Sequence, residues 1–326
     1  MTRLGFLGVA HVHADGYAEL LRRLPGVELV GFTEADPELA AAFGRTTGLP
    51  AFADPQALAG QVDGALICSE NAARRALVET AAAAGVHVLC EKPLATTLQD
   101  AQAMQAACEA GGVRFMTAFP MRYAPPALAL RARLQAGQLG PLLAVSGVNH
   151  SESPARHRAW FADPQAAGGG AVMDHVVHLA DLLRWMQGQE IGRVFAQVRT
   201  RPSAPSDTHA LLLLTLQDGL NASIDPSWSR PAGYPRWGHL RMEVVGERAT
   251  AVMDAFAEHL TLYPAGEPGR PAWLNYGLDA NLGMLQAFVA MVRGAPSPIT
   301  WNDGYQAMRV ALAAYASQQQ GQPVLL

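Results

Sequence analysis

The first third of the chain alternates short apolar runs with helical patterns, and this alternation restricts the folds that it can adopt. Strand-like runs separated by helices of about ten to fifteen residues are typical of βαβ units and of a parallel, doubly wound α/β sheet. Because βαβ crossovers are right-handed, the carboxyl ends of the strands should meet at one rim. The expected strands are 3–9, 27–33, 64–68, 86–89 and 113–117, and the expected helices are 15–24, one opening at Asp36-Pro37, 74–84 and 97–111.

After Pro125-Pro126 the pattern changes, because strand-like runs now dominate. Asp218-Gly219, between two of these runs, is typical of a hairpin turn. We therefore expect a second, α+β domain, with a mostly antiparallel sheet and helices on one face. Its expected strands are 142–149, 193–199, 209–216, 220–224, 240–245 and 260–263, and its expected helices are one ending at Gln135, 281–293 and 303–318.

The composition excludes several classes of partner. The chain has 326 residues, of which 50% are apolar and 16% charged, and its net charge is −4 with no Lys/Arg run, which argues against a nucleic-acid or anionic-membrane partner. The longest apolar stretches are far below membrane-spanning length. Three cysteines fit a reducing compartment better than a disulfide framework. These features predict a soluble cytoplasmic protein.

The loop after the first expected strand is a candidate for binding phosphate. Its residues 8–13 stand where a dinucleotide-binding G-x-G-x-x-G motif would lie, and a helix that begins there can hold a pyrophosphate with its free N–H groups. Ala10 and His13 replace the second and third glycines, and we expect His13 to crowd the contact between helix and strand. The cofactor-binding candidates in this loop are Gly8, Ala10, His11 and Val12.

Glu34 ends the second expected strand and indicates which dinucleotide binds. A carboxylate at this position can accept hydrogen bonds from an adenosine ribose and repels a 2′-phosphate. Ala35 follows, so no arginine is present there to accept that phosphate. We therefore predict NAD rather than NADP. Alternatively, Glu34 belongs to an acidic turn that caps the next helix.

Lys92 lies in Glu91-Lys92-Pro93, at the end of the fourth expected strand. Pro93 lacks an N–H and keeps Lys92 out of helical geometry, so the chain must turn there. Open α/β sheets bind ligands at the carboxyl ends of their strands. An ammonium in this position can polarise a substrate oxygen. The alternative is a Glu-Lys pair on the surface.

A second group of polar residues follows the glycine run 168–170, at the start of an expected helix. Asp174 and His178 are four residues apart, so their side chains project from one face, with Asp181 a turn further on. A carboxylate can orient a histidine and raise the basicity of its other nitrogen. The glycines would permit a ligand to approach the helix closely. In the alternative interpretation Asp174 caps the helix and His178 bonds a loop carbonyl.

Together, Glu91-Lys92-Pro93 and the later Gly169-Gly170, Asp174 and His178 resemble the motifs of the Gfo/Idh/MocA oxidoreductases, and the resemblance covers nearly the whole chain. It implies an NAD(P)-dependent dehydrogenase acting on the CH–OH group of a sugar, cyclitol or related polyol. His178 would take the hydroxyl proton, Lys92 would bond the same oxygen, and Asp174 would orient His178.

The resemblance also implies a division of the chain and a set of further contacts. Residues 1–122 would form a Rossmann domain that binds the dinucleotide, and residues 123–326 would bind substrate and form a homodimer or homotetramer. Cofactor contacts would include Ser69, Asn71, Glu91 and Lys92. Weaker candidates for the substrate pocket are Arg122, Tyr123, His157 and Trp160.

Two other functions remain open from the sequence. His11 and His13 form an H-x-H pair like that of metal-dependent hydrolases, and His178 could complete such a site. That class needs a barrel of eight strand–helix units, whereas the second half here has the pattern of an antiparallel sheet. The other alternative is a catalytically silent NAD-binding sensor that uses the same fold.

Overall fold

The computed structural model describes residues 1–257, 259–262, 272–275, 277 and 279–326. The chain folds into two compact units, neither of which is continuous in sequence. The first comprises Met1–Phe119, Ala155–Gly168 and Asn281–Tyr305, and the second comprises Pro120–Pro154, Gly169–Ala280 and Gln306–Leu326. A single division of the chain after residue 122 would therefore separate Ala155–Gly168 and Asn281–Tyr305 from the first unit, to which they belong.

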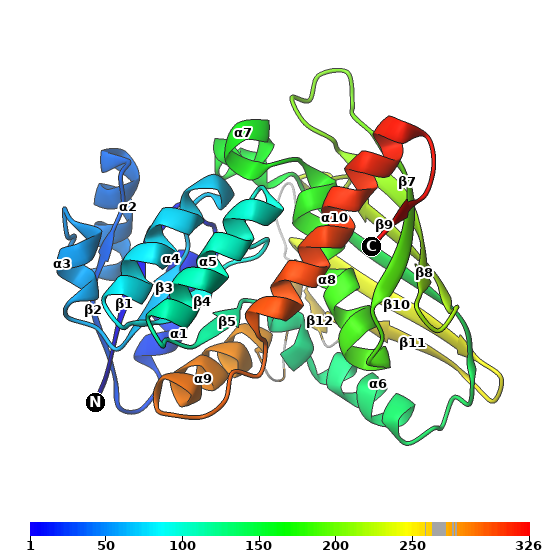
Figure 1. The fold of residues 1–326 in the computed structure, drawn as a ribbon, viewed down its shortest axis with the longest axis horizontal. Coiled ribbons are helices and arrows are strands. Elements are labelled where there is room, and N and C mark those ends of the chain that lie inside the picture. The colour runs from blue at the N-terminus through cyan, green and yellow to red at the C-terminus, as the bar shows by residue number, and fades with distance from the viewer. Residues whose placement is uncertain (258, 263–271, 276, 278) are drawn as a thin grey trace. The chain divides into compact units, whose positions relative to one another are not determined.

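The first unit is built on a five-stranded parallel sheet in the order β2-β1-β3-β4-β5 (Figure 1). The predicted doubly wound sheet is confirmed. The strand order reverses between β1 and β3, and this switch point is where such sheets bind ligands. β1 and β3 are nearly continuous apolar runs because both faces of this sheet are buried. The strands are β1 Thr2–Leu7, β2 Val27–Thr33, β3 Gly64–Ile67, β4 His87–Cys90 and β5 Phe115–Thr117.

The helices of the first unit include two that were not predicted, α3 and α7, and one, α9, that was expected in the second domain. Helix α3 was not predicted because its five residues are too short to display a period. Asp36 caps α2 by accepting hydrogen bonds from the N–H groups of Glu38 and Leu39, whereas α1 begins without a side-chain cap. The helices are α1 Ala14–Arg22, α2 Pro37–Thr47, α3 Pro55–Ala59, α4 Arg74–Ala83, α5 Leu98–Ala110, α7 Pro164–Ala167 and α9 Ala280–Val292.

The second unit contains a seven-stranded sheet in the order β11-β10-β6-β9-β8-β7-β14. Its neighbours are antiparallel except for β6 and β9, so the predicted mostly antiparallel sheet is confirmed. Gly219, with φ of +92°, turns the chain between β8 and β9 in the predicted hairpin. The strands are β6 Leu142–Ser151, β7 Ile191–Arg199, β8 His209–Leu216, β9 Asn221–Ser227, β10 Gly238–Gly246, β11 Thr250–Asp254 and β14 Val324–Leu325.

A separate pair, β12 His259–Leu262 and β13 Ala272–Asn275, forms a two-stranded sheet. The strand predicted for 260–263 corresponds to β12, and residue 263 and the loop from 264 to 271 lie outside the described residues.

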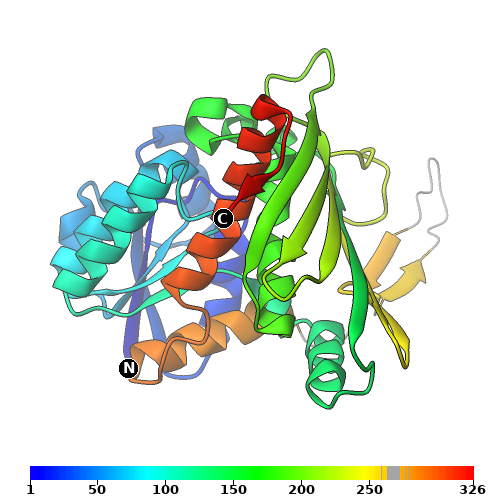
Figure 2. The same cartoon turned by 45° about the vertical axis from the view of Figure 1, so that its right-hand side comes forward.

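Helices cover one face of the seven-stranded sheet (Figure 2). They are α6 Pro125–Gln135, α8 Ala171–Gln187 and the part of α10 (Trp301–Gln320) that belongs to this unit. Burial alternates along β8, where Leu212 and Leu214 are buried and Leu211 and Leu213 are each 54% exposed. The sheet thus has one buried and one open face, as predicted.

Among the described residues, no helix combines the length and apolar character needed to cross a membrane.

Candidate functional site

The loop after β1 packs tightly against the end of β3, at the switch point of the parallel sheet. Gly8 has φ of +80°, and a Cβ atom there would lie 2.6 Å from the Cβ of Ser69. The Gly8 N–H donates to the carbonyl of Thr33 at 3.0 Å, and the His11 N–H donates to the carbonyl of Cys68 at 2.7 Å. Only glycine satisfies both the backbone geometry and the close approach at position 8.

Glu34 ties the end of β2 to this loop. Its Oε2 accepts the Val9 N–H at 2.8 Å, while Oε1 accepts the N–H groups of Ala35 at 2.8 Å and Asp36 at 3.1 Å. Asp36 caps α2, so Glu34 does belong to the acidic turn before that helix, as the alternative interpretation has it. An ionised carboxylate can accept about four hydrogen bonds. Oε2 therefore retains capacity for a ribose hydroxyl, which fits the residue to a bound NAD.

Lys92 is buried, with 4% of its surface exposed, and Glu91 beside it is 1% exposed. The alternative of a surface salt pair is therefore wrong. The Lys92-Pro93 peptide is cis, and the Lys92 N–H donates to Glu91 Oε2 at 3.1 Å. These contacts fix the turn at the carboxyl end of β4.

Arg74, for which the sequence indicated no role, joins the loops that follow β3 and β4. Its guanidinium is fully buried and donates to the carbonyls of Ser69 at 3.2 Å, Glu91 at 3.0 Å and Pro93. A buried arginine that bonds main-chain carbonyls leaves no periodic signal, so the pattern of residues indicated no role for it. It sets the spacing between the loops after β3 and β4.

Ser69 and Asn71, the two cofactor candidates after β3, are both buried. The Asn71 Nδ2 donates to the carbonyl of Ala167 at 2.8 Å, and its Oδ1 has no hydrogen-bond partner among the described residues. Buried acceptors in proteins are normally satisfied. This oxygen is therefore suited to a donor on a bound ligand.

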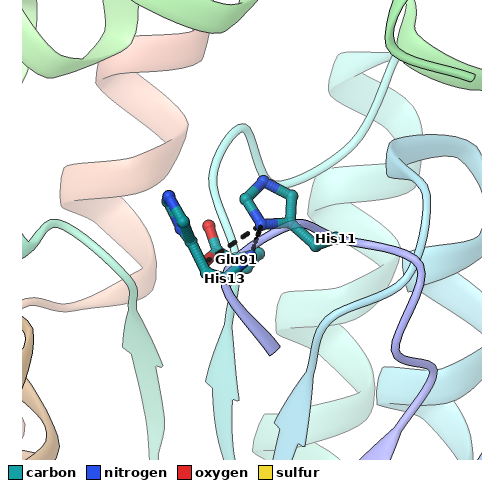
Figure 3. Close-up of side chains that lie close together, drawn as sticks. All are labelled: His11, His13 and Glu91. Carbon is teal, nitrogen blue, oxygen red and sulfur yellow. Dashed lines mark hydrogen bonds and ion pairs between the residues drawn. The ribbon is translucent and has the colours of Figure 1, made fainter. Parts of the chain in front are cut away.

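His13 does not crowd the helix–strand contact, so that expectation is wrong. Its backbone is right-handed helical, with φ of −81° and ψ of −16°, which any residue adopts. Its side chain reaches the end of β4 instead, and Nδ1 lies 2.9 Å from Glu91 Oε1 (Figure 3). Tyr17 donates its hydroxyl to the same oxygen at 2.7 Å.

In this cluster the pKa values of Glu91 and His11 are both shifted from their usual values. Burial by itself raises the pKa of Glu91, but the neighbouring His11 and His13 rings, the hydrogen bond from His13 and the charge of Lys92 outweigh it. The pKa of Glu91 therefore lies well below the usual value. Burial holds the pKa of His11 well below that of a free imidazole, so His11 is neutral at physiological pH.

Trp160 and Phe161 cover the phosphate-loop candidate within the first unit. The two rings stack at 3.9 Å, and the Trp160 Nε1–H donates to the carbonyl of Ala10 at 3.0 Å. Phe161 lies 5.2 Å from the ring of His11. Trp160, a candidate for the substrate pocket, thus contacts the candidate phosphate loop.

In the second unit, the glycine run before α8 accommodates protein groups, not the expected ligand. A Cβ on Gly169 would collide with the hydroxyl of Tyr315, and one on Gly170 would collide with the carbonyl of Asp207. The Asp207 carboxylate accepts the N–H of Gly170 at 2.7 Å and that of Val172 at 2.8 Å, and it also accepts the Tyr315 hydroxyl at 2.7 Å. Asp207 therefore caps α8, so the alternative role of Asp174 as its cap is wrong.

Asp174 and His178 are the positions in the first two turns of α8 that are only half-buried. Asp174 Oδ2 accepts the Trp228 Nε1–H at 3.1 Å and lies 3.2 Å from Nε2 of His175. His175 is itself held at Nδ1 by the carbonyl of Asn149, at 2.9 Å. The sequence identified the shared face, but it did not identify Trp228 or His175 as partners of Asp174.

The other substrate-pocket candidates, Arg122, Tyr123 and His157, differ in their surroundings. Arg122 is buried in a two-pronged ion pair with Asp181, its Nε 2.8 Å from Oδ2 and its Nη2 2.5 Å from Oδ1. Asp181, which the sequence placed near His178 on the helix, is therefore the ion-pair partner of Arg122. Burial raises the pKa of Tyr123 to about 12, so its hydroxyl stays protonated. His157 lies exposed in the first unit.

Family models match both halves of the chain. Residues 2–119 match an oxidoreductase family with an NAD-binding Rossmann fold, and residues 127–252 match the GFO/IDH/MocA C-terminal domain. The inositol 2-dehydrogenase of Acidothermus cellulolyticus is 30% identical, over 97% of this chain and 92% of its own length. The chain belongs to the GFO/IDH/MocA family of oxidoreductases.

Other relatives support the same assignment. The D-apiose dehydrogenase of Paraburkholderia graminis is 27% identical, over 99% of this chain and 88% of its own length. GenD2 from gentamicin A biosynthesis, crystallised with NAD, shares the fold with a TM-score of 0.88 at 24% identity, over 100% of this chain and 96% of its own. The predicted family is confirmed, and so are its oxidoreductase class and its NAD-binding Rossmann domain. The hydrolase alternative is dropped, because the parallel sheet is open with five strands and the matched family is oxidoreductive.

We expect Glu91→Gln to lower the free energy of unfolding at pH 7 by about 2 kcal/mol, because it removes hydrogen bonds to a buried charge. A carboxylate whose pKa is lower in the folded state than in the unfolded state stabilises the fold at pH values above its unfolded-state pKa. That contribution is lost as the pH falls through the folded-state pKa. The difference from the native protein should therefore shrink below about pH 4.5.

Urea unfolding of both proteins between pH 3 and 7 measures this difference. Glu79→Gln, which changes an exposed ion pair on α4, is the matched control and should have little effect. A difference that stays constant down to pH 3 would contradict an ionised Glu91.

Proposed function

We propose that this family member is an NAD-dependent dehydrogenase that oxidises a secondary alcohol of a sugar, cyclitol or related polyol, or reduces the matching ketone. The observation that carries the proposal is a buried Lys92 at the carboxyl end of β4, on the same rim as the dinucleotide loop. A lysine held there, in a chain of this family, is placed to act on a substrate and not to solubilise a surface. Relatives named for inositol and apiose suggest the polyol class.

The cofactor contacts in this proposal come from the switch-point rim. Gly8, Ala10, His11 and Val12 would line the pyrophosphate, with Glu34 on the adenosine ribose. Ser69 and Asn71 would contact the cofactor after β3, where Asn71 offers the buried Oδ1. NAD, when bound, supplies the hydride acceptor.

The proton chemistry is assigned to three side chains. His178 would take the proton from the reacting hydroxyl as a general base, and Lys92 would donate a hydrogen bond to the same oxygen. Asp174 would orient the site, its Oδ2 being held by Trp228. Arg122 is committed to Asp181, so we assign it to supporting the fold beside the substrate.

We also propose the division of roles that the sequence suggested, with residues 1–122 binding NAD and residues 123–326 binding the substrate and pairing with another copy.

We expect His178→Ala and Lys92→Ala each to lower kcat by about 10²–10⁴, the range for a positioned acid or base. The affinity of His178→Ala for NAD should be unchanged, because the substitution lies outside the cofactor rim. NADH formation across a panel of sugars and cyclitols identifies the substrate, and calorimetry measures the affinity for NAD.

Glu109→Gln, at an exposed position on α5, is the control and should leave both quantities unchanged. Full turnover by either alanine variant would contradict the assigned roles. Binding of NAD with no turnover on any member of the panel would favour the silent sensor.

We expect Glu34→Ser to shift cofactor preference towards NADP by about tenfold or more, since it removes a carboxylate that repels the 2′-phosphate. The ratio of kcat/KM with NAD to that with NADP measures the shift. Glu38→Gln, on the exposed face of α2, is the charge-matched control. An unchanged ratio would show that Glu34 does not contact the adenosine ribose.

We infer that a second copy covers the open face of the seven-stranded sheet. Leu211 and Leu213 are exposed there, and Phe195 lies opposite Leu213 on β7. Contiguous apolar surface of this kind is typical of an interface.

We expect Leu213→Arg to convert a homodimer or homotetramer into smaller species in analytical ultracentrifugation. Leu128→Arg, at an exposed leucine on α6, should not. A native protein that sediments as a monomer would refute the inference.

A further inference from the structure

Two histidines in the loop after β1 flank one buried carboxylate. His11 and His13 come from that loop, and Glu91 directly follows β4. Figure 3 shows the two imidazole rings on either side of the Glu91 carboxylate. One ligand atom from each of these residues lies within 4.8 Å of the other two, and no other such group of His, Cys, Asp and Glu side chains occurs in the described part of the chain. The cluster therefore has the residue types and the proximity of a metal-binding site.

The spacing within the cluster is close to that of metal ligands. His13 Nδ1 lies 2.9 Å from Glu91 Oε1, and His11 Nδ1 lies 3.6 Å from the same oxygen. Zinc holds nitrogen and carboxylate oxygen ligands at about 2.0–2.2 Å, so tetrahedral ligands lie about 3.3–3.6 Å from one another. Small movements of these side chains would therefore be sufficient to enclose an ion.

The contact between His11 and Glu91 brings two hydrogen-bond acceptors together. His11 Nδ1 accepts the N–H of His13 at 3.3 Å, so this nitrogen carries no proton. It nevertheless faces an oxygen of the ionised Glu91, which can also only accept. Two lone pairs that face each other in a buried site repel, and a cation between them replaces this repulsion with attraction. The juxtaposition points to a positively charged ligand.

The surroundings of Glu91 are also those of a metal ligand. Tyr17 donates its hydroxyl to Oε1 at 2.7 Å, and the Lys92 N–H donates to Oε2 at 3.1 Å. Outer hydrogen bonds of this kind orient ligating carboxylates. The side chains of His11 and Glu91 are 2% and 1% exposed, whereas that of His13 is 31% exposed. The His13 side of the cluster thus gives an ion a path from solvent.

We propose that His11 Nδ1, His13 Nδ1 and Glu91 Oε1 bind a divalent transition-metal ion, and that zinc is the ion that this donor set fits best. Two imidazoles and one carboxylate suit zinc, whereas magnesium and calcium prefer oxygen ligands alone. The hydrogen between His13 and Glu91 would leave to solvent as a proton, and the ion would take its place. The bound ion would fasten the loop after β1 to the end of β4. This site is independent of the proposed function and implies no hydrolytic chemistry.

Nearby positive charge disfavours ions that are held by charge alone. Lys92 follows Glu91 in the chain, and the Arg74 guanidinium donates to the Glu91 carbonyl at 3.0 Å. These two charges oppose the entry of any cation, so binding depends on the bonds that imidazole nitrogens form with transition metals. The site should therefore select zinc over magnesium.

Calorimetry on the full chain, stripped with a chelator that is then removed, tests the proposal with zinc chloride and with magnesium chloride. We expect one zinc ion per chain and no binding of magnesium. His13→Gln and His11→Gln should each weaken zinc binding about 100-fold or more. Tyr17→Phe should weaken it about tenfold, because the loss of an outer hydrogen bond costs less affinity than the loss of a ligand.

His150→Gln is the matched control. His150 lies 3.0 Å from Asp225, but the pair belongs to no group of three ligating side chains among the described residues. This variant should bind one zinc ion with the affinity of the native chain.

Cobalt reports ligation by residue 13 directly. His13→Cys replaces one zinc ligand with another, so it should retain the ion. The cobalt(II)-loaded variant should gain a thiolate-to-metal charge-transfer band that the cobalt(II)-loaded native protein lacks. Zinc should also raise the thermal unfolding temperature of the native chain but not that of His13→Gln.

Three results would overturn the proposal. They are a native chain that binds no zinc, zinc binding that survives both His13→Gln and His11→Gln, and an equal loss of binding in His150→Gln. Survival in both variants would assign the ion to an adventitious site. Thermal unfolding without metal reports whether each variant folds, and if one histidine variant does not, the other and His13→Cys decide. A chain that oxidises a polyol with NAD but binds no zinc refutes this inference alone, whereas one that binds zinc but no NAD refutes the proposed function alone.

Discussion

The buried carboxylate of Glu91 provides the interactions on which the rim of the parallel sheet depends. One of its oxygens accepts from His13 and Tyr17, so it joins the loop after β1 and helix α1 to the end of β4. Its other oxygen accepts the N–H of Lys92 and fixes the turn that holds that lysine. A buried charge is tolerated only when it is fully hydrogen-bonded, so these contacts are mutually dependent.

In the second unit a buried carboxylate likewise holds the start of α8. Asp207 accepts hydrogen bonds from two N–H groups of the helix and from the hydroxyl of Tyr315, and glycines at 169 and 170 allow this approach. In both units a carboxylate from a distant part of the chain secures the beginning of a helix or the end of a strand. The proposed catalytic residues lie directly beside these points, so their positions depend on interactions that take no part in the chemistry.

The pattern of apolar residues was sufficient to predict most elements and the type of each sheet. β2 runs from Val27 to Thr33 as expected, and α8 begins just after the predicted glycines. Helix α3 and the short strand β14 gave no pattern, because five residues and two residues are too few to show a period. The assignment of Ala155–Gly168 and Asn281–Tyr305 to the first unit was also beyond local pattern, since it depends on packing between distant segments.

The sequence by itself determined the fold class, the family with its NAD-binding domain, and the shared face of Asp174 and His178. These follow from periodicity, from strand ends and from spacing along one helix, all of which are local. Only the tertiary structure decided that His13 pairs with Glu91, 78 residues away, and that Trp228 holds Asp174, 54 residues away. Such partners are chosen by strand order and crossover, which bring distant side chains together, and no local pattern of residues records that choice.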